Sequence, residues 1–333
     1  MEETQSAPGG PRRPTVVLLT SAGTPPPYNL RSLEEQAEIV PTDAAGLPRA
    51  LPGAQVLFVW DFFSTALRDA WPHADALGWV HVAAAGVDSL LFDALCASEV
   101  EVTNASGAFD GPIAEFVLAS VLAHDKQLHT SKELQRQGVW RHREVRRTRG
   151  QRVLVVGTGG IGRATARLLR AVGLEVRGAG RTARDADPDF GTVVASADLA
   201  RHAAWADHVV LIAPLTEETR GIVGAEVLAR MRPSAHLVNV GRGALVDEPA
   251  LVEALRTGGI AAASLDVFDE EPLPPGHPFW RLDNVHVSAH MSGDVVGWRE
   301  TLADQFAQNL ARWRAGEPLA NRVDKQLGYV PGR

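Results

Sequence analysis

The run Val153-Leu154-Val155-Val156-Gly157-Thr158-Gly159-Gly160-Ile161-Gly162 decides the fold of this chain. Its apolar, β-branched first half is typical of a strand that is buried on both faces. Residues 163–174 follow with apolar side chains at helical spacing, so the glycines lie at a strand-to-helix turn. There Gly157 permits the tight turn, Gly159 admits a pyrophosphate to the backbone, and Gly162 lets helix and strand pack closely. The stretch therefore predicts a dinucleotide-binding turn rather than a glycine turn without a ligand.

Length and composition narrow the class of protein. A chain of 333 residues is long for one core, which predicts two domains, and its 45% hydrophobic and 22% charged residues are ordinary for a globular protein. The net charge of −7 argues against a general binder of nucleic acid or of anionic membranes, and no apolar segment reaches membrane-spanning length. Residues 1–14 predict a disordered leader without a signal-peptide core. The single Cys96 excludes an internal disulfide and a cysteine-rich metal site, so we expect a cytoplasmic enzyme without a metal.

Strands and helices alternate on both sides of the glycine turn. Before it, we predict a helix over 30–39 and strands over 16–19, 56–60, 78–82 and 100–103, which make a small parallel sheet. A long helix that begins near Gly111 and runs past His129 is expected to connect two lobes. After the turn, a doubly wound dinucleotide domain is predicted from helices at 225–231 and 248–256 and strands at 174–179, 208–213, 236–240, 260–265 and 285–288. A closing helix is expected over 295–315, packed on the first lobe.

Two segments keep alternative interpretations. The third strand runs into residues 83–88, where small residues would let backbone N–H groups face a small anion, although a plain tight turn explains them equally well. Arginines are dense between Arg141 and Arg152. A solvated surface segment is the favoured interpretation, and an anion-attracting rim is the minority one, because the chain as a whole is acidic.

The end of the strand over 174–179 indicates which nucleotide binds. In such domains an acidic residue at this position holds the ribose 2′-hydroxyl of NAD, whereas an arginine accommodates the 2′-phosphate of NADP. Here Gly180-Arg181-Thr182 ends the strand, Arg184 is close by, and no acid occurs before Asp185. A guanidinium can pair bidentately with a phosphate that a carboxylate would repel. We therefore predict that Arg181, Thr182 and Arg184 contact the cofactor and that NADP is preferred over NAD, the alternative being surface arginines without a ligand.

Three titratable residues follow at the ends of later strands: Arg242, Glu271 and His290. Taken singly, they have plain explanations as a surface ion pair, an acid at the start of a helix and a hydrogen-bonded core histidine. After a dinucleotide turn, the three together predict an anion holder, an acid/base group and the carboxylate that orients it.

With these motifs in this order, and with residues 214–221 (Pro-Leu-Thr-Glu-Glu-Thr-Arg-Gly) between them, the chain resembles the D-isomer-specific 2-hydroxyacid dehydrogenases, a family that includes phosphoglycerate dehydrogenases and glyoxylate/hydroxypyruvate reductases. The resemblance covers nearly everything after the leader. It implies an α/β protein of two doubly wound parallel-sheet domains, in which a Rossmann nucleotide-binding domain is inserted into a flavodoxin-like substrate domain. The nucleotide domain, with its connecting helix, would cover 109–293, and the substrate domain 15–108 and 294–333. The resemblance also implies a homodimer formed through the nucleotide domain.

The resemblance assigns a role to each motif residue. It implies that Arg242 binds the substrate carboxylate, that His290 is the general acid in reduction, and that Glu271 favours its imidazolium form. The backbone N–H groups of Ala85 and Gly86 would hold the substrate carboxylate as well. Further cofactor contacts are implied for Gly157, Gly159, Gly160, Ile161, Gly162, Ala213, Pro214, Val240, Gly241, Arg242, Asp266, His290 and Gly293, with Asp266 near the nicotinamide amide.

These observations lead to an expected reaction. We expect reversible reduction of a small 2-ketoacid, glyoxylate- or hydroxypyruvate-like, to the D-2-hydroxyacid with NADPH, with NADH as a possible substitute, and no nucleic-acid or membrane partner. Glu271 argues against formate as the substrate, because the formate dehydrogenases that resemble this pattern replace that glutamate. Residues 291–294 and Trp298 lie where the family varies, which leaves the pocket size open. The alternative is a non-catalytic, nucleotide-sensing protein on the same scaffold, as the corepressor members of the family are, and measured turnover separates the two.

Overall fold

The computed structural model describes residues 13–331, so most of the leader predicted over 1–14 lies outside the described residues. The described chain divides into two compact units. The first unit consists of residues 13–106 and 297–331, and the second unit of Gly107–Val296. Each unit is built around its own parallel sheet, as the alternating pattern of the sequence predicts, so both are described separately below.

The first unit contains a five-stranded, all-parallel sheet in the order β2-β1-β3-β4-β5, which is the flavodoxin-like order. Its strands are β1 (Thr15–Leu19), β2 (Glu38–Thr42), β3 (Val56–Val59), β4 (Trp79–Val82) and β5 (Glu101–Thr103). Its helices are α1 (Leu30–Glu34), α2 (Leu47–Ala50), α3 (Ala66–Ala70), α4 (Asp93–Ala97), α11 (Trp298–Ala315) and the 3-10 turn η1 (Trp71–His73).

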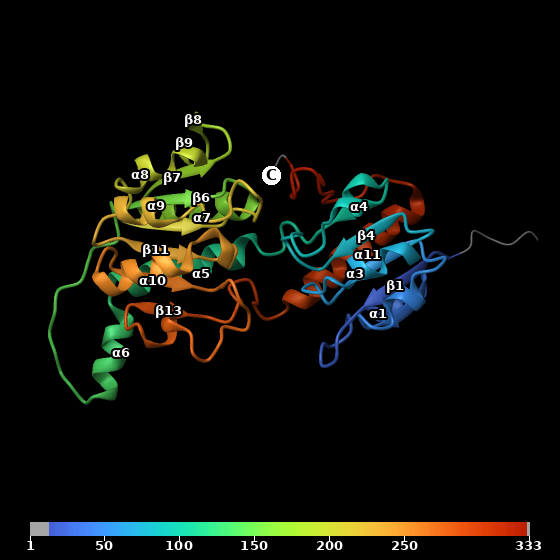
Figure 1. The fold of residues 1–333 in the computed structure, drawn as a ribbon, viewed down its shortest axis with the longest axis horizontal. Coiled ribbons are helices and arrows are strands. Elements are labelled where there is room, and N and C mark those ends of the chain that lie inside the picture. Colours follow the sequence, from blue (N-terminus) through green and yellow to red (C-terminus); the bar gives the residue numbers. More distant parts are fainter. Residues whose placement is uncertain (1–12, 332–333) are drawn as a thin grey trace, which may run out of the picture. The chain divides into compact units, whose positions relative to one another are not determined.

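The last helix of the chain packs on the sheet of the first unit. The ring of Phe306 on α11 stacks on Phe58 of β3 with centroids 3.9 Å apart, and it lies 5.3 Å from the ring of Trp79 on β4. All three side chains are buried, so the C-terminal segment completes the core of a unit whose strands come from the beginning of the chain (α11 is red in Figure 1).

The second unit contains an eight-stranded sheet in the order β13-β12-β11-β10-β6-β7-β9-β8, in which only the β8–β9 pair is antiparallel. Read from β9 to β12, this is the Rossmann order 3-2-1-4-5-6. The strands are β6 (Arg152–Val156), β7 (Glu175–Gly180), β8 (Arg184–Asp187), β9 (Gly191–Ala195), β10 (His208–Leu211), β11 (His236–Asn239), β12 (Ala262–Leu265) and β13 (Val285–Val287). The helices are α5 (Asp110–Asp125), α6 (Leu128–Arg136), α7 (Gly160–Ala171), α8 (Leu199–Ala203), α9 (Ala225–Arg230), α10 (Glu248–Thr257) and the 3-10 turns η2 (Ser196–Asp198), η3 (Gly243–Leu245) and η4 (Pro278–Arg281).

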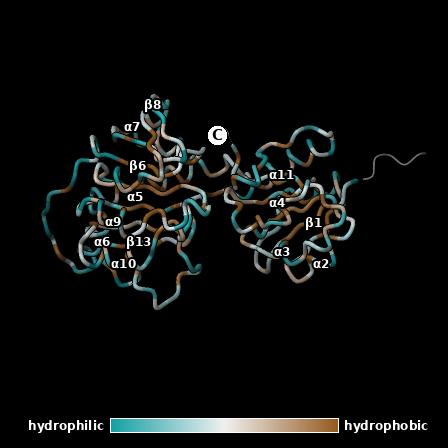
Figure 2. The backbone as a smooth tube through the Cα atoms, turned by 45° about the horizontal axis from the view of Figure 1, so that its top comes forward, coloured by the Kyte–Doolittle hydropathy of each residue, from teal (hydrophilic) through white to brown (hydrophobic). Residues whose placement is uncertain are grey.

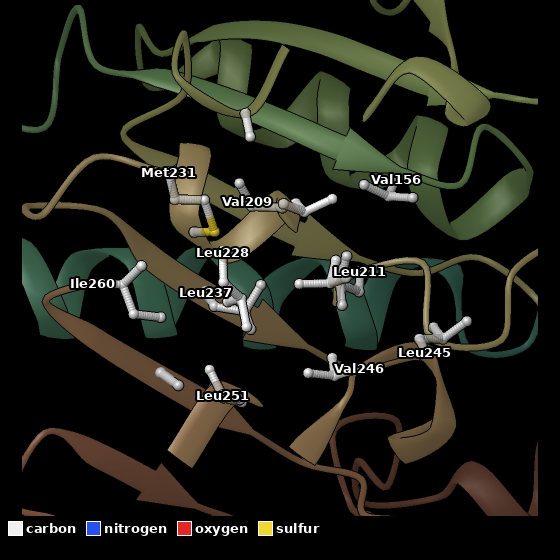
Figure 3. Close-up of a cluster of buried hydrophobic side chains, with 14 of the residues drawn as sticks. Val156, Val209, Leu211, Leu228, Met231, Leu237, Leu245, Val246, Leu251 and Ile260 are labelled. Atoms are coloured by element: carbon white, nitrogen blue, oxygen red, sulfur yellow. The ribbon is translucent and has the colours of Figure 1, made fainter. Parts of the chain in front are cut away.

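Apolar strands form the core of the second unit. Residues Val153–Val156 of β6 are at most 1% exposed, as expected for a strand covered on both faces. Figure 3 shows Leu237 of β11 beside Leu228 of α9, and both belong with Val209 and Leu211 of β10 to one cluster of buried side chains. In Figure 2 the hydrophobic colour follows the backbone along β6, where the strand leads into the glycine turn. The sheet therefore holds its carboxyl-end loops on a rigid base.

Some predicted elements are wrong. The helix predicted over 30–39 ends at Glu34, and 38–42 forms β2, an edge strand that tolerates Pro41 because its outer side needs no ladder donor. The helix expected to run past His129 stops at Asp125, and α6 begins only after Gln127, which has a left-handed φ of 49°. Strands β8 and β9 were not predicted. The helix expected from residue 163 starts earlier, at Gly160, within the glycine turn itself.

Candidate active site and dinucleotide turn

In the glycine turn between β6 and α7, Gly157 and Gly162 are closely packed and Gly159 is open to a ligand, as the sequence predicts. Gly157 has a φ of 114°, and a Cβ there would lie 2.6 Å from the backbone nitrogen of Ala213. A Cβ at Gly162 would collide with the carbonyl oxygen of Gly157, so both positions need glycine. At Gly159, by contrast, a Cβ would meet nothing within 4 Å. The backbone is therefore open at the N-cap of α7, where a pyrophosphate would bind.

The residues at this turn suit a dinucleotide. Gly160 and Ile161 form the first turn of α7, whose leading N–H groups have no partner within the helix and attract an anion. Ile161 packs against the apolar cluster of the second unit, and its carbonyl accepts a hydrogen bond from the Thr165 hydroxyl at 2.8 Å. The first turn is thus fixed in place on its inner side.

Arg181 and Thr182 follow the end of β7 and are exposed. The hydrogen bond from the Thr216 hydroxyl, together with the positive charge of Arg181, keeps the pKa of Glu218 below its usual value. The guanidinium of Arg181 therefore lies near the loop that follows β10, at the carboxyl edge of the sheet. This is the edge at which Rossmann domains bind the ribose of the adenosine half.

Arg184 lies on β8 and is committed to a neighbouring carboxylate. Its Nε donates to Oδ2 of Asp187 at 2.8 Å, and Arg163 donates to both oxygens of the same carboxylate at 3.2 Å. The Asp187 side chain is only 2% exposed. Burial raises its pKa, but the hydrogen bonds from the two guanidinium groups and from the backbone N–H groups of Asp189 and Phe190 outweigh this and lower the pKa to about 2. Asp187 was not predicted from the sequence, although its i+3 spacing from Arg184 is a usable signal. Of the two predicted arginines, Arg181 is the one placed directly at the end of β7.

The ends of β10 and β11 lie against each other. Ala213 and Val240 are each 6% exposed, and Gly241 is buried with its Cα close to the carbonyl oxygen of Ala213: a Cβ there would lie 3.1 Å from that oxygen. Pro214 follows and is exposed. These four predicted cofactor contacts therefore come together at one stretch of the carboxyl edge.

The loop that carries Arg242 is fixed by an asparagine that the sequence analysis did not single out. The Asn239 amide donates to the carbonyl of Arg242 at 2.8 Å, and its oxygen accepts from the N–H of Gly241 at 3.1 Å. Arg242 is partly buried and donates from Nη1 to the carbonyl of Gly241 at 2.8 Å. An asparagine at a strand end before glycine is a recognisable turn signal. Asn239 thus orients the backbone from which the arginine projects.

The next residue brings the Arg242 loop against the loop of Glu271. A Cβ at Gly243 would overlap the backbone of Phe268 and Asp269, so the two loops touch at this point. Glu271 in turn accepts from the N–H of Phe268 at Oε1 over 2.9 Å. Two of the three predicted catalytic residues are therefore held on directly contacting loops.

His290 and Glu271 form a hydrogen-bonded pair. Nδ1 of His290 lies 2.7 Å from Oε2 of Glu271, and each side chain is 29% exposed. Burial raises the pKa of Glu271, but the hydrogen bonds from His290 and Phe268 and the charges of His290 and Arg242 lower it below its usual value. The glutamate is therefore an anion at neutral pH. Because a carboxylate can only accept, Nδ1 of His290 is the donor in this hydrogen bond.

Asp266 organises the segment around His290. The Asp266 side chain is fully buried and accepts hydrogen bonds from the Ser288 hydroxyl (2.6 Å) and from the N–H groups of Met291 (3.0 Å) and Ser292 (2.8 Å). Its carbonyl also accepts from the N–H of His290 at 2.8 Å. His290 has a left-handed φ of 49°, an uncommon conformation for a non-glycine residue that these bonds hold in place. This positioning role was not apparent from the sequence.

Two further predicted positions have defined surroundings. Gly293 packs against Phe109, because a Cβ there would lie 2.6 Å from Cδ1 of the ring. Ala85 and Gly86 follow β4 in the first unit and are partly buried. The Asn104 amide holds the carbonyl of Ala85 at 2.6 Å, while among the described residues no hydrogen bond engages the N–H groups of Ala85 and Gly86. These donors suit a small carboxylate.

Two structural absences hold for residues 13–331. No group of three or more His, Cys, Asp or Glu side chains in this range is arranged to bind a metal ion. Over the same range, none of the helices has both the length and the apolar character needed to span a bilayer.

Comparisons with known proteins identify a family and relatives that this chain resembles. The family profile described as "D-isomer specific 2-hydroxyacid dehydrogenase, NAD binding domain" matches residues 118–292. A glyoxylate reductase of Aeropyrum pernix is 34% identical over 275 residues, which cover 79% of this chain and 81% of that protein.

Two solved structures cover nearly the whole chain. A D-isomer specific 2-hydroxyacid dehydrogenase of Xanthobacter autotrophicus Py2, in complex with NADPH and MES, has a TM-score of 0.76 and 34% identity over 94% of this chain and 99% of that one. An NADPH-dependent glyoxylate/hydroxypyruvate reductase of Sinorhizobium meliloti, in complex with NADP and sulfate, has a TM-score of 0.79 and 27% identity over 96% and 100%.

Proposed function

Because this chain belongs to the D-isomer specific 2-hydroxyacid dehydrogenase family, we propose that it reduces a small 2-ketoacid, glyoxylate- or hydroxypyruvate-like, to the D-2-hydroxyacid with NADPH. The protein is an NAD(P)-dependent enzyme of that family; the substrate, the cofactor preference and the residue roles are the proposal. One observation carries it: a histidine held at 2.7 Å by the ionised Glu271, on loops that also fix Arg242. This arrangement suits protonation of a carbonyl oxygen beside an anion-binding arginine.

The proposed roles follow from the charges and hydrogen bonds of these side chains. The guanidinium of Arg242 binds the substrate carboxylate and polarises the 2-keto oxygen. Glu271 stabilises the imidazolium of His290, which donates its Nε2 proton to that oxygen and takes it back in the reverse direction. NADPH, when bound at Gly157–Gly162 and the ends of β7, β10 and β11, supplies the hydride that C2 of the substrate receives.

The preference for NADPH rests on Arg181. It follows β7 directly, and no acid occurs between Gly180 and Asp185. Arg184, the other predicted arginine, is already bound to Asp187. The Xanthobacter and Sinorhizobium relatives hold NADPH and NADP, respectively. A guanidinium at this strand end suits a 2′-phosphate, and residues 180–184 contain no acid of the kind that holds the free 2′-hydroxyl of NAD.

The proposed reaction is tested by NADPH oxidation with a panel of 2-ketoacids. We expect turnover with glyoxylate or hydroxypyruvate and a loss of at least ~10²-fold in kcat for His290→Ala, because the general acid is removed. His73→Ala removes an exposed histidine of the first unit and should leave kcat unchanged. Nucleotide binding without turnover of any ketoacid would identify a nucleotide-sensing binding protein instead.

The cofactor preference is tested separately. We expect Arg181→Asp to lower kcat/KM for NADPH by about 10- to 100-fold, the effect of losing one or two charge-assisted phosphate hydrogen bonds and gaining a repulsive charge. The kcat/KM for NADH should change little. The control Arg201→Ala removes an exposed arginine on α8 and should leave kcat/KM for both nucleotides unchanged. A wild-type enzyme that uses NADH at least as well as NADPH would refute the assignment.

We also propose a homodimer formed through the second unit. Residues 128–148, here called the arm, comprise α6 and the extended segment after it, which leave the body of the unit (green in Figure 1). Trp140 on the arm is 98% exposed, and Leu128 and Val145 are 54% and 46% exposed. The arm is nevertheless anchored, because the ring of His129 on α6 stacks on His286 of β13 with centroids 3.5 Å apart, and Arg143 donates to Gln127 at 2.7 Å. An anchored, exposed tryptophan is typical of a contact with a second chain.

The oligomer is tested by light scattering after gel filtration. We expect a dimeric mass for the wild type and a shift toward the monomer for Trp140→Ser, because the interface loses its aromatic anchor. Trp280→Ser is the matched control, since Trp280 is also exposed in the second unit but lies outside the arm. A wild-type mass of one chain would refute the dimer, and an unchanged dimer in Trp140→Ser would exclude the arm as its anchor.

A further inference from the structure

A cavity of about 600 Å³ lies at the edge of the second unit's sheet that the proposed reaction does not use. It is lined by residues at the amino ends of β6, β7, β10 and β11 and by the segment that precedes β6. Its charged lining consists of Arg146, Arg147, Arg149, Arg152, Glu175 and Asp207. The glycine turn lies at the carboxyl end of β6, five residues away along an extended strand, or about 15 Å. The two places are therefore separate.

Three of the four arginine side chains are held in position. Nη1 of Arg146 donates to the carbonyl of Ser234 at 2.9 Å. Arg152 lies 3.6 Å from Asp207 through Nε. The aliphatic stem of Arg149 lies on Gly173, where a Cβ would come within 2.8 Å of Cγ. Guanidinium groups whose stems are already fixed lose less conformational freedom when they bind an anion than mobile surface arginines do.

The lining carries an excess of positive charge on a chain whose net charge is −7. Of the two acids, Asp207 is already compensated, since it accepts from Nη1 of Arg232 at 2.6 Å and from the backbone N–H of Arg152 at 2.9 Å. Within the described part of the chain, no hydrogen bond or ion pair engages the guanidinium groups of Arg147 and Arg149. The guanidinium groups of Arg147 and Arg149 thus lack an acceptor within the described residues. They line the same cavity as Arg146 and Arg152, whose guanidinium groups are held by the contacts above.

We propose that this cavity is a second anion site, which binds a pyrophosphate group, either free or as part of a nucleoside polyphosphate. Paired guanidinium forks match adjacent phosphate groups bidentately, which favours a multiply charged, extended anion over a single small ion. The volume lies in the range of small-ligand sites. The inference does not depend on the proposed reaction, because its residues lie at the opposite edge of the sheet.

The experiment is isothermal titration of the full-length protein with inorganic pyrophosphate, in metal-free buffer at fixed ionic strength and with saturating NADPH. The NADPH occupies the dinucleotide turn, so that pyrophosphate cannot compete there. We expect saturable binding of one pyrophosphate per chain, weakened at least 10-fold in Arg147→Gln/Arg149→Gln. The control Arg230→Gln/Arg314→Gln removes two exposed charges elsewhere and should bind within twofold of the wild type.

Further measurements distinguish free pyrophosphate from a nucleoside polyphosphate and control for misfolding. Tighter binding of ATP than of pyrophosphate would identify a nucleoside polyphosphate, and equal or weaker binding the free anion. The single variant Arg147→Gln should bind pyrophosphate about 3-fold more weakly than the wild type. Its Tm and its Kd for NADPH should be unchanged. The proposal is overturned by a wild type that binds no pyrophosphate, by equal affinity in the double variant, or by sulfate binding as tightly at the same ionic strength.

Discussion

Replacing Glu271 by Gln isolates the contribution of the carboxylate charge to the proposed reaction. The amide has nearly the same shape, so its oxygen can still accept the hydrogen bond from Nδ1 of His290, which now spans 2.7 Å. What is lost is the negative charge that stabilises the imidazolium. In the reduction, His290 must carry the proton that it donates, so the substitution acts on the group that reacts.

The magnitude follows from the distance and the exposure. Two unit charges about 4 Å apart interact by ~4 kcal/mol at an effective dielectric constant of 20. Both side chains are 29% exposed, and solvent screening reduces this value toward the ~1.5–3 kcal/mol of a hydrogen bond to a charged group. A loss of about 2 kcal/mol lowers kcat/KM for the ketoacid roughly 30-fold at neutral pH.

The assay is kcat/KM for reduction of the ketoacid with NADPH, measured at neutral pH. We expect the loss of about 30-fold there, because the substitution removes the charge and leaves the hydrogen-bonding shape of the side chain. Glu248→Gln is the matched control, because Glu248 also lies beside a histidine, with Oε2 3.3 Å from Nε2 of His277. An unchanged kcat/KM in Glu271→Gln would refute the role of the pair.

Three other substitutions test the scaffold of the site. Asp187→Asn should lower the free energy of unfolding by ~2–4 kcal/mol at pH 7, because two guanidinium groups lose a buried partner. Since the pKa of Asp187 is about 2, that difference should vanish in urea titrations as the pH falls from about 4 toward 2. Gly243→Ala should reduce kcat/KM at least ~10²-fold, because the Arg242 loop and the Glu271 loop, which touch at Gly243, must separate. The control Gly276→Ala, where a Cβ meets nothing within 4 Å, should leave kcat/KM unchanged. Asp266→Asn should lower kcat more than it raises the KM for NADPH, because an amide cannot accept all the hydrogen bonds that this carboxylate accepts. Equal effects on kcat and KM in steady-state kinetics would contradict the role of Asp266 in positioning His290.

The sequence predicted the elements whose burial leaves a strong pattern. Strands such as Val153–Val156 are apolar on both faces, and the strand-to-helix context made the glycine spacing interpretable. The edge strands had no such signal: β2 contains a proline and has no buried residue, while β8 has the sequence Arg-Asp-Ala-Asp. The end of α5 was missed for a similar reason, because the left-handed Gln127 lies in a segment without glycine or proline. In these segments the neighbouring structure, rather than local preference, determines the conformation.

The candidate site divides in the same way. Strand-end motifs and family resemblance predicted Arg242, Glu271 and His290, and the second unit places Glu271 and His290 in direct contact. The residues that hold them could not be predicted, because their partners are far apart in sequence. Asp266 binds the backbone more than twenty residues later, and Gly243 packs against a loop that only the folded sheet brings near. Periodicity carries no information on such long-range contacts.

The stacking of Phe306 on Phe58 and Trp79 also bears on the order in which a ribosome would deliver a foldable protein. The strands of the first unit precede the second unit in the chain, yet the helix that covers these two rings is translated only after the whole second unit. The second unit is encoded without interruption, so it can reach its native state while the earlier sheet still exposes an aromatic surface. During that interval, the nascent chain presents a surface of the kind that cellular chaperones recognise.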